Sequence, residues 1–333
     1  MDRFLLLQLA AMQCHPMMCN NGAVQMPAGS CVNLVNNTLY LEPCKDNNKP
    51  FCDSGTDVSY CTANPLFPEE LSYPGEPCNK KKHCKYGECL EGYCQSKALK
   101  EDCNLDEECN PGLYCSNNKC VKQLELGATG CKSDYECVNW AACSEGECIQ
   151  YFSLPANAST SRCFSQFSEL CAGGMCWQGL CIDPVQSFNE SALPRKCNSY
   201  MDCTSEASSH RVFYSDCMCG MNPEGASYCT LFPGDLIYAH LITVITNWIN
   251  SEMSDRCNTV RRLSSYCISQ FWDKPNSEEL FLYYYRTYFY PQLQGNDDCI
   301  KDIFTGFYWD TIATITHAKY MFFSSLIIVY LLA

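Results

Sequence analysis

The 333-residue sequence lacks the motifs of the common enzyme classes. It contains no Gly-x-Ser-x-Gly, no His-Glu-x-x-His and no phosphate-binding glycine loop, and its 5 histidines are scattered along the chain. The Cys-x-x-Cys spacing of many zinc sites and thiol redox enzymes is also missing. These absences predict a protein that is not an enzyme and that binds no metal ion and no cofactor.

Positive charge is scarce. The chain has 23 Lys+Arg against 37 Asp+Glu, only 18% of its residues are charged, and its formal net charge is −14. Such a chain repels the phosphate backbone of nucleic acids, and it has no basic stripe to counteract that repulsion. We therefore expect protein partners or self-assembly, and no nucleic acid.

Long apolar runs are missing from the middle of the chain, so an ordinary hydrophobic core is not expected there. The chain has 30 cysteines instead, an even number that allows up to fifteen disulfides. Cysteines at this density are typical of disulfide scaffolds in oxidising compartments. The middle of the chain should therefore be held together by disulfides outside the cell.

The two ends of the chain are hydrophobic. Residues 4–12 match the apolar region of a signal peptide with cleavage near Gln13, and the alternative is a first helix of the mature fold. Residues 320–333 are uncharged and too short to span a membrane alone. A lipid (GPI) anchor signal is favoured for this tail over a single-pass helix, and a buried core helix is the third option. We expect an extracellular protein anchored at the cell surface.

Three sequons agree with an extracellular location, because N-glycans are added in the secretory pathway. The expected acceptor residues are Asn36, Asn157 and Asn189.

From Cys78 onward the cysteines form groups close to the template C-x5-C-x5-C-x4-C. The first cysteines of the first four groups lie 25, 28 and 32 residues apart, which indicates a degenerate internal repeat. The four quartets are Cys78, Cys84, Cys89, Cys94; Cys103, Cys109, Cys115, Cys120; Cys131, Cys137, Cys143, Cys148; and Cys163, Cys171, Cys176, Cys181. A fifth group carries an insertion and contains Cys197, Cys203, Cys217, Cys219 and Cys229.

Turn-forming residues separate these cysteines, so each group should form short β-hairpins and turns. A unit this small cannot bury enough apolar surface, and two bridges of about 2 to 4 kcal/mol each must stabilise it. Four cysteines allow three pairings. Among them we expect first with third and second with fourth, which interlocks two short loops.

These groups resemble the Dickkopf-type N-terminal cysteine-rich and EB-like modules of secreted and surface proteins, including cysteine-rich surface proteins of ciliates. The resemblance covers about Cys78 to Cys229 and is carried by stretches such as Asp102–Cys109 and Lys196–Cys203. It implies an extracellular, disulfide-knotted module and little about ligands.

Cysteine parity predicts links between regions. The fifth group has an odd number of cysteines and so does the segment beyond it, so we expect a bridge from Cys229 to one of the last three cysteines: Cys257, Cys267 and Cys299. The six N-terminal cysteines should pair among themselves: Cys14, Cys19, Cys31, Cys44, Cys52 and Cys61.

After Cys229 the apolar residues recur at helical spacing, as in Ile237, Leu241, Val244 and Trp248. If Cys257 and Cys267 share the next helix, about 15 Å separates them and each must bridge to another element. A further helix should start near 275–279, capped by Asn276, and stop at Pro291.

Aromatic residues cover every face of this last predicted helix, over 280–290. Packing against neighbouring helices is one interpretation, and an exposed aromatic surface for glycan stacking or self-association is the other. Tyr284 and Tyr288 are therefore candidate binding residues. Trp140 and Trp177, which we expect in equivalent stretches of two modules, are further candidates, with burial against the adjacent module as the alternative.

The fold class expected is small disulfide-rich repeat modules followed by a disulfide-stapled α-helical C-terminal domain. The parts are a signal peptide (1–13), an N-terminal cysteine-rich region (14–74), tandem modules (75–230), a helical domain (231–310) and a hydrophobic tail (311–333). Linear repetition favours a structural or assembly role as stalk, coat or filament. The alternative is a receptor-like or inhibitory module that binds a protein through its loops.

Overall fold

The computed structural model describes residues 14–19, 30–46, 48–49, 51–53, 60–62, 71–79, 84–163, 166–187, 193–206 and 211–294. The predicted signal peptide (1–13), Asn189, Cys299 and the hydrophobic tail (311–333) lie outside these residues. The described part consists of many short strands in small sheets, with few helices and 13 disulfides between described cysteines. It is a disulfide-rich fold of small modules.

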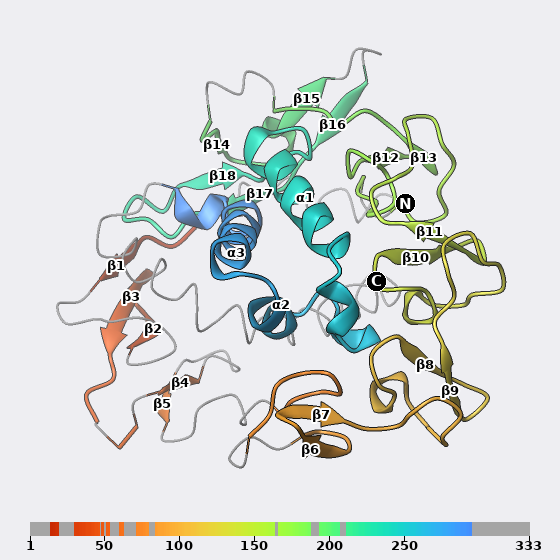
Figure 1. Ribbon diagram of the computed structural model, residues 1–333. Coiled ribbons are helices and arrows are strands. Elements are labelled where there is room, and N and C mark those ends of the chain that lie inside the picture. Colours follow the sequence, from red (N-terminus) through yellow and green to blue (C-terminus); the bar gives the residue numbers. More distant parts are fainter. Residues whose placement is uncertain are drawn as a thin grey trace. The chain divides into compact units, whose positions relative to one another are not determined.

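Each of the first four modules is built on one β-hairpin (Figure 1). The hairpins are β6–β7 (Glu88–Leu90, Tyr93–Gln95), β8–β9 (Leu113–Ser116, Lys119–Lys122), β10–β11 (Ala141–Ser144, Glu147–Gln150) and β12–β13 (Cys176–Trp177, Leu180–Cys181). In every hairpin the third cysteine of the module lies opposite the fourth, as Cys143 lies opposite Cys148. Both central turn residues have positive φ, the type I′ geometry whose twist matches that of the strands. These turns are Glu91-Gly92, Asn117-Asn118, Glu145-Gly146 and Gln178-Gly179.

A second turn leads into each module ahead of its first cysteine. One residue of this leading turn has positive φ, and its N–H donates to the carbonyl of the module's fourth cysteine over 2.7 to 2.8 Å. The four residues are Gly75, Lys100, Gly127 and Asn157. Ser72 forms an isolated β-bridge with Cys84, so module 1 begins before residue 75, the start that the sequence predicts for the modules. We number the modules 1 (71–95), 2 (97–122), 3 (124–150), 4 (154–182) and 5 (196–229).

An acidic residue before the second cysteine recurs for a local reason. In η1 (Asp106–Glu108) and η2 (Asp134–Glu136), Glu108 and Glu136 accept the N–H of the residue that follows the first cysteine, both over 3.0 Å. Asp202 in η4 (Tyr200–Asp202) does the same over 2.8 Å. This side chain therefore fixes the loop between the first two cysteines in modules 2, 3 and 5.

The bridges follow the expected pairing in modules 1 to 4. First joins third and second joins fourth, with Cα–Cα distances of 5.4 to 5.9 Å. The pairs are Cys78–Cys89 and Cys84–Cys94, Cys103–Cys115 and Cys109–Cys120, Cys131–Cys143 and Cys137–Cys148, and Cys163–Cys176 and Cys171–Cys181.

Module 5 corrects two expectations. Cys197 pairs with Cys217, and Cys229 pairs with Cys203 inside the module, so Cys229 forms no bridge to the C-terminal segment. The additional cysteine, Cys219, pairs with Cys14, so the six N-terminal cysteines do not close among themselves. The odd number of cysteines in the fifth group shows only that at least one of them pairs outside the group. It does not say which cysteine does so, or with which partner.

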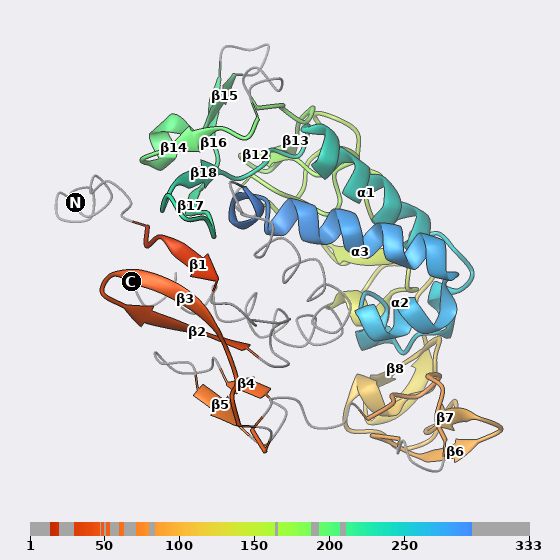
Figure 2. The same ribbon diagram turned by 90° about the vertical axis from the view of Figure 1, so that its left-hand side faces the viewer.

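The strands of module 5 and of the N-terminal region form small sheets. Module 5 contains the sheet β14–β18–β17 (Lys196–Cys197, Ser227–Cys229, Cys217–Cys219) and the hairpin β15–β16 (Thr204–Glu206, Val212–Tyr214). The N-terminal region contains the sheet β1–β3–β2 (Met17–Cys19, Thr38–Pro43, Ser30–Val35), visible in Figure 2, and the pair β4–β5 (Phe51–Asp53, Tyr60–Thr62). β1 is parallel to β3, while β2 is antiparallel to it.

Helices follow module 5. They are α1 (Leu236–Ile249), α2 (Ser265–Phe271) and α3 (Lys274–Tyr288), with the short turns η5 (Ser254–Arg256), η6 (Thr259–Arg261) and η7 (Pro291–Leu293). α1 buries an ordinary apolar face that includes Leu241, Val244 and Trp248, as predicted.

Cys257 and Cys267 do not share one straight helix, so the condition under which each would bridge to another element is not met. Cys257 follows η5, the chain turns through η6, and α2 then carries Cys267, so the two cysteines bridge each other with Cα atoms 6.0 Å apart. The cap of α3 also differs, because Asp273 accepts the N–H of Asn276 over 3.1 Å, and Asn276 itself lies inside the helix.

The described residues divide into two compact units. Unit 1 contains 14–62, 185–238 and 282–294, and unit 2 contains 71–184 and 239–281. The helices are shared between the units and do not form a third one. Within the described residues, no helix is both long enough and apolar enough to cross a membrane.

The buried clusters of the modules are built from cysteines and not from large apolar side chains. The buried clusters of modules 2 to 5 consist mostly of cysteines, and that of module 5 holds only Cys197, Cys203, Cys217 and Cys229. Disulfides therefore take the place of an apolar core in the modules, as the composition predicts.

Candidate functional site

The candidate site lies in unit 2, where one loop between helices contacts three modules. We call residues 254–262 the hub loop; it contains η5 and η6. Figure 1 shows the hairpins of modules 1 to 4 in succession along one side of α1 and α2, which flank this loop. The contacts are made by polar side chains that reach the backbone of the modules.

Module 1 is held to the hub loop by a buried ion pair. Nε of Arg261 lies 3.3 Å from Oε1 of Glu76, and these side chains are 6% and 0% exposed. The guanidinium also lies over the ring of Tyr73, 4.6 Å from its centroid. Glu76 in turn accepts the N–H of Tyr73 over 2.8 Å. A buried carboxylate is tolerated only with such partners, so Arg261 fixes the leading turn of module 1.

Module 2 is held by Asn258. Its amide Nδ2 donates to the carbonyls of Cys109 over 2.8 Å and of Glu107 over 3.2 Å, while its Oδ1 caps η6 by accepting the N–H of Val260. The side chain is completely buried. Asn258 thus satisfies carbonyls of module 2 and starts η6 at the same time.

Module 3 makes the largest set of bonds. Thr259 Oγ1 donates to the carbonyl of Tyr135 over 2.8 Å and accepts from Nε2 of Gln123, the residue just before module 3, over 3.0 Å. Asn139 Nδ2 donates to the carbonyls of Ser254 and Cys257 over 2.7 and 3.0 Å.

Arg262 completes the contact with module 3. It donates to three carbonyls of this module over 3.4 Å each, those of Cys137, Val138 and Ala141. A 3.2 Å bond joins its guanidinium to the hydroxyl of Tyr151. The polar groups buried at this interface are therefore satisfied by one another.

Module 4 contacts α1 through a glycine. A Cβ placed on Gly174 would lie 2.7 Å from Cδ1 of Ile242 and 3.2 Å from Phe167. Arg162 of module 4 forms ion pairs with Asp134 of module 3 and with Glu169. Burial acts to raise the pKa of Asp134, but the bonds from Arg162 outweigh it and hold that pKa below its usual value. Modules 3 and 4 are therefore joined by a carboxylate that is ionised at neutral pH.

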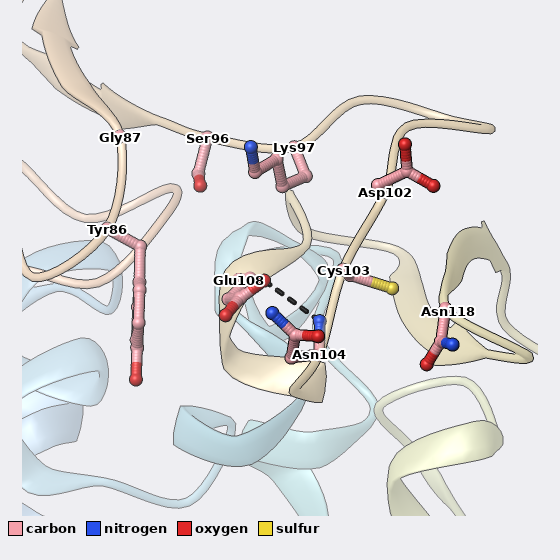
Figure 3. A pocket seen from close by; sticks show the side chains of 9 residues that line it. All are labelled: Tyr86, Gly87, Ser96, Lys97, Asp102, Cys103, Asn104, Glu108 and Asn118. Atoms are coloured by element: carbon pink, nitrogen blue, oxygen red, sulfur yellow. Dashed lines mark hydrogen bonds between the residues drawn. The ribbon is translucent and has the colours of Figure 1, made fainter.

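An open groove of about 560 Å³ lies where module 1 meets module 2 (Figure 3). Tyr86 forms one side of it and Asp102 and Asn118 lie on the other, while Glu108 accepts the N–H of Asn104. Asp102 pairs with Lys119 over 2.6 Å, which holds the pKa of this exposed carboxyl below its usual value. Both carboxylates that line the groove, Asp102 and Glu108, therefore have partners within the protein.

The tryptophans predicted as binding residues are not equivalent. Trp177 follows the third cysteine within β12, whereas Trp140 precedes the corresponding strand β10. Alignment on the third cysteine places Trp177 at the position of Ser144, and Trp140 at that of Gly173. Both indole rings are half-buried.

The aromatic helix packs in the described structure. Leu280, Phe281 and Tyr285 are buried, and Tyr284 and Tyr288 are half-buried with ring centroids 4.5 Å apart. Burial raises the pKa of Tyr284, and Tyr288 raises it further. This arrangement agrees with the packing interpretation of the segment.

Clusters of sulfur atoms occur in the modules, for example Cys103, Cys109 and Cys120, but their members are bonded in disulfides. A sulfur in a disulfide is not a thiolate, so these clusters do not offer the ligands that zinc requires.

Two of the predicted glycosylation sites are exposed on turns. Asn36 is the first central residue of the β2–β3 turn, and Asn157 is the positive-φ residue of the leading turn of module 4. Asparagine tolerates this left-handed conformation, which explains its use at both positions.

Sequence reasoning missed the residues of the hub loop. Arg261 and Arg262 are adjacent, yet one contacts module 1 and the other module 3, and Asn258 resembles any loop asparagine. No motif or periodicity marks these residues. No family model, curated protein or solved structure matches the chain, so the resemblance to Dickkopf-type and EB-like modules stays a prediction from cysteine spacing.

Proposed function

We propose that this protein is an extracellular, cysteine-rich surface glycoprotein with a structural or assembly role, anchored to the membrane through its C-terminal tail. The many disulfides point to an extracellular or secreted protein, since such bridges form and persist in oxidising compartments. The proposal includes no catalytic activity and no cofactor.

The observation that carries the structural role is the hub loop. Modules 1, 2 and 3 bond to Arg261, Asn258 and Arg262, residues more than 100 positions away in the chain. Modules that were only strung together would contact their neighbours alone. This packing favours a braced building block over an extended stalk, and a coat or filament assembled from such blocks is the version that we propose.

The exposed sequons support the same proposal. N-glycans at Asn36 and Asn157 would lie on turns, where they disturb neither the disulfides nor the hub loop. N-glycans and disulfide-braced modules suit a protein that must persist outside the cell.

The test is crosslinking on intact cells with a membrane-impermeant lysine reagent, followed by mass spectrometry. Exposed lysines that can react include Lys97, Lys119 and Lys122. We expect the reagent to label the protein on intact cells. We also expect crosslinks between lysines that lie too far apart within one copy of the chain, which shows that two copies are in contact. Labelling only after lysis would contradict the surface location, and a monomer crosslinked to a single different protein would contradict the assembly role.

A receptor-like binding role is the second candidate, and the hairpin tips favour it. Beside the turns of modules 1 and 4 the opposed residues are apolar, Leu90 with Tyr93 and Trp177 with Leu180. Leu90, Tyr93 and Leu180 are 44 to 47% exposed. Aromatic and aliphatic side chains of this kind are common anchors in protein interfaces.

This second role predicts that Leu90→Ser with Tyr93→Ser abolishes the crosslink to the different protein while secretion and disulfides are unchanged. The matched control is the polar tip of module 3, changed as Ser144→Ala with Glu147→Ala, which removes no lysine and should leave the crosslink intact. Equal effects of the two variants would contradict binding through the tip of module 1.

A further inference from the structure

The bridge Cys14–Cys219 differs from the module bridges in its place in the chain. It closes a loop with a sequence separation of 205, while the bridges of modules 1 to 5 have separations of 10 to 26. Module 5 already has two complete bridges without Cys219, namely Cys197–Cys217 and Cys203–Cys229. The sulfur of Cys219 is therefore not needed for either of the two bridges inside module 5.

Exposure also separates this bridge from its neighbours. Cys14 and Cys219 are half-buried, whereas the four other cysteines of module 5 are at most 6% exposed. A dithiol reductant must reach a sulfur atom to attack it, so access favours attack on Cys14–Cys219 within this module.

Little else holds the N-terminal segment on module 5. In the described residues, the N–H of Met17 donates to the carbonyl of Asn222 over 2.9 Å, and the backbone at Cys14 and Pro16 packs against Gly225. A Cβ on Gly225 would lie 2.9 Å from the carbonyl oxygen of Cys14. Once the bridge is opened, the thiols of Cys14 and Cys219 lie on segments that are held together by this hydrogen bond and the packing at Gly225, and that no short loop joins. Their effective concentration is therefore lower than that of two thiols within one module, and they reclose less readily.

We propose that Cys14–Cys219 is a redox-labile clasp that releases the N-terminal segment 14–19 from module 5 while the module bridges stay closed. A thiolate of a dithiol reductant attacks one sulfur and displaces the other as a thiolate. The second thiol of the reductant then resolves the mixed disulfide, leaving a cyclic disulfide and two protonated cysteine thiols. Release frees the N–H of Met17 from the carbonyl of Asn222, while β1 keeps its pairing with β3.

The clasp is tested on the full-length protein in buffers with graded ratios of reduced to oxidised dithiothreitol, quenched with an alkylating reagent and mapped by mass spectrometry. Cys14–Cys219 should be half-reduced at a ratio at least about tenfold lower than Cys203–Cys229. The matched control is Cys44–Cys61, which is also half-buried but has a sequence separation of 17. It should require a more reducing buffer than the clasp.

Reduction of Cys14–Cys219 together with Cys203–Cys229, or only as readily as Cys44–Cys61, overturns the proposal. A second measurement uses Cys14→Ser with Cys219→Ser. This variant should keep all module bridges and lose hydrogen-exchange protection at the amide of Met17, while the amide of Cys229, bonded to the carbonyl of Arg195, stays protected. Loss of protection at both amides would make the bridge a structural part of module 5 and would also overturn the proposal.

Discussion

At the scale of single residues, the buried pair of Arg261 and Glu76 should be the most sensitive point of unit 2. We expect Arg261→Met to destabilise the unit by about 3 to 5 kcal/mol, because it leaves a buried carboxylate without its cation. Urea denaturation measures this loss. The control is Arg261→Met combined with Glu76→Gln, which should recover much of the stability, since it removes the unpaired charge. Equal destabilisation of the single and double variants would show that packing, and not charge pairing, is what the arginine supplies.

Asp134 should make unit 2 sensitive to acid. The partners of this carboxyl hold its pKa below the usual value, so its stabilisation is fully present above the unfolded-state pKa of about 3.9 and is lost as the pH falls through the lower folded-state pKa. Between these two pKa values, we expect this carboxyl to lower the free energy of unfolding by up to about 1.4 kcal/mol for each unit that the pH falls. Asp134→Asn should reduce this dependence of stability on pH. Urea midpoints between pH 6 and pH 2 measure it. Asp183→Asn, at an exposed position, is the control, and identical slopes in all three proteins would contradict the prediction.

At the scale of elements, the contact between α1 and module 4 depends on a missing side chain. Gly174 has φ of +71° and lies against Ile242, while Gly112 has φ of +76° with open space where a Cβ would lie. Gly112→Ala should cost about 1 to 2 kcal/mol from backbone conformation alone. Gly174→Ala should cost about 1 to 3 kcal/mol more than Gly112→Ala, because its new methyl group also overpacks against Ile242. Combining it with Ile242→Val should recover part of the difference, and equal costs for both glycine variants would contradict the contact.

The hairpins show how far local sequence specifies an element. Cysteine spacing and turn residues predict the hairpins and the pairing of modules 1 to 4, because every partner lies within 13 residues. The helical spacing that begins at Cys257 does not correspond to one straight helix, because it runs across η6 and α2, two separate short helices. Hydrophobic periodicity alone does not separate these cases.

At the scale of the whole molecule, complete reduction should unfold the modules without denaturant. Their buried clusters consist largely of cysteines, so the reduced chain has too little apolar surface to bury. We expect hydrogen-exchange protection of the module hairpins to be lost at 25 °C after reduction and alkylation. Cys257→Ser with Cys267→Ser, which removes one bridge outside the modules, should keep the hairpins protected. Protected hairpins in the fully reduced chain would contradict this account.

Glycosylation is the prediction that bears on the whole surface. We expect N-glycans at Asn36 and Asn157, detected by enzymatic deglycosylation and peptide mass. Thr38→Ala and Ser159→Ala should each remove one glycan while leaving the asparagine in its left-handed conformation. Unmodified asparagines in protein secreted by a glycosylating cell would contradict both the prediction and the support that it lends to the proposed function.

The sequence by itself determined the disulfide-rich class, the repeat, the module pairing and the first helix, since these depend on residues close together in the chain. Tertiary structure alone decided which distant residues meet. Cys14 pairs with Cys219 over a separation of 205, and Arg261 pairs with Glu76 over a separation of 185. Such contacts leave no period or spacing in the sequence. They form because folded modules present carbonyls, a carboxylate and a sulfur that each need a partner, and only the three-dimensional path of the chain supplies it.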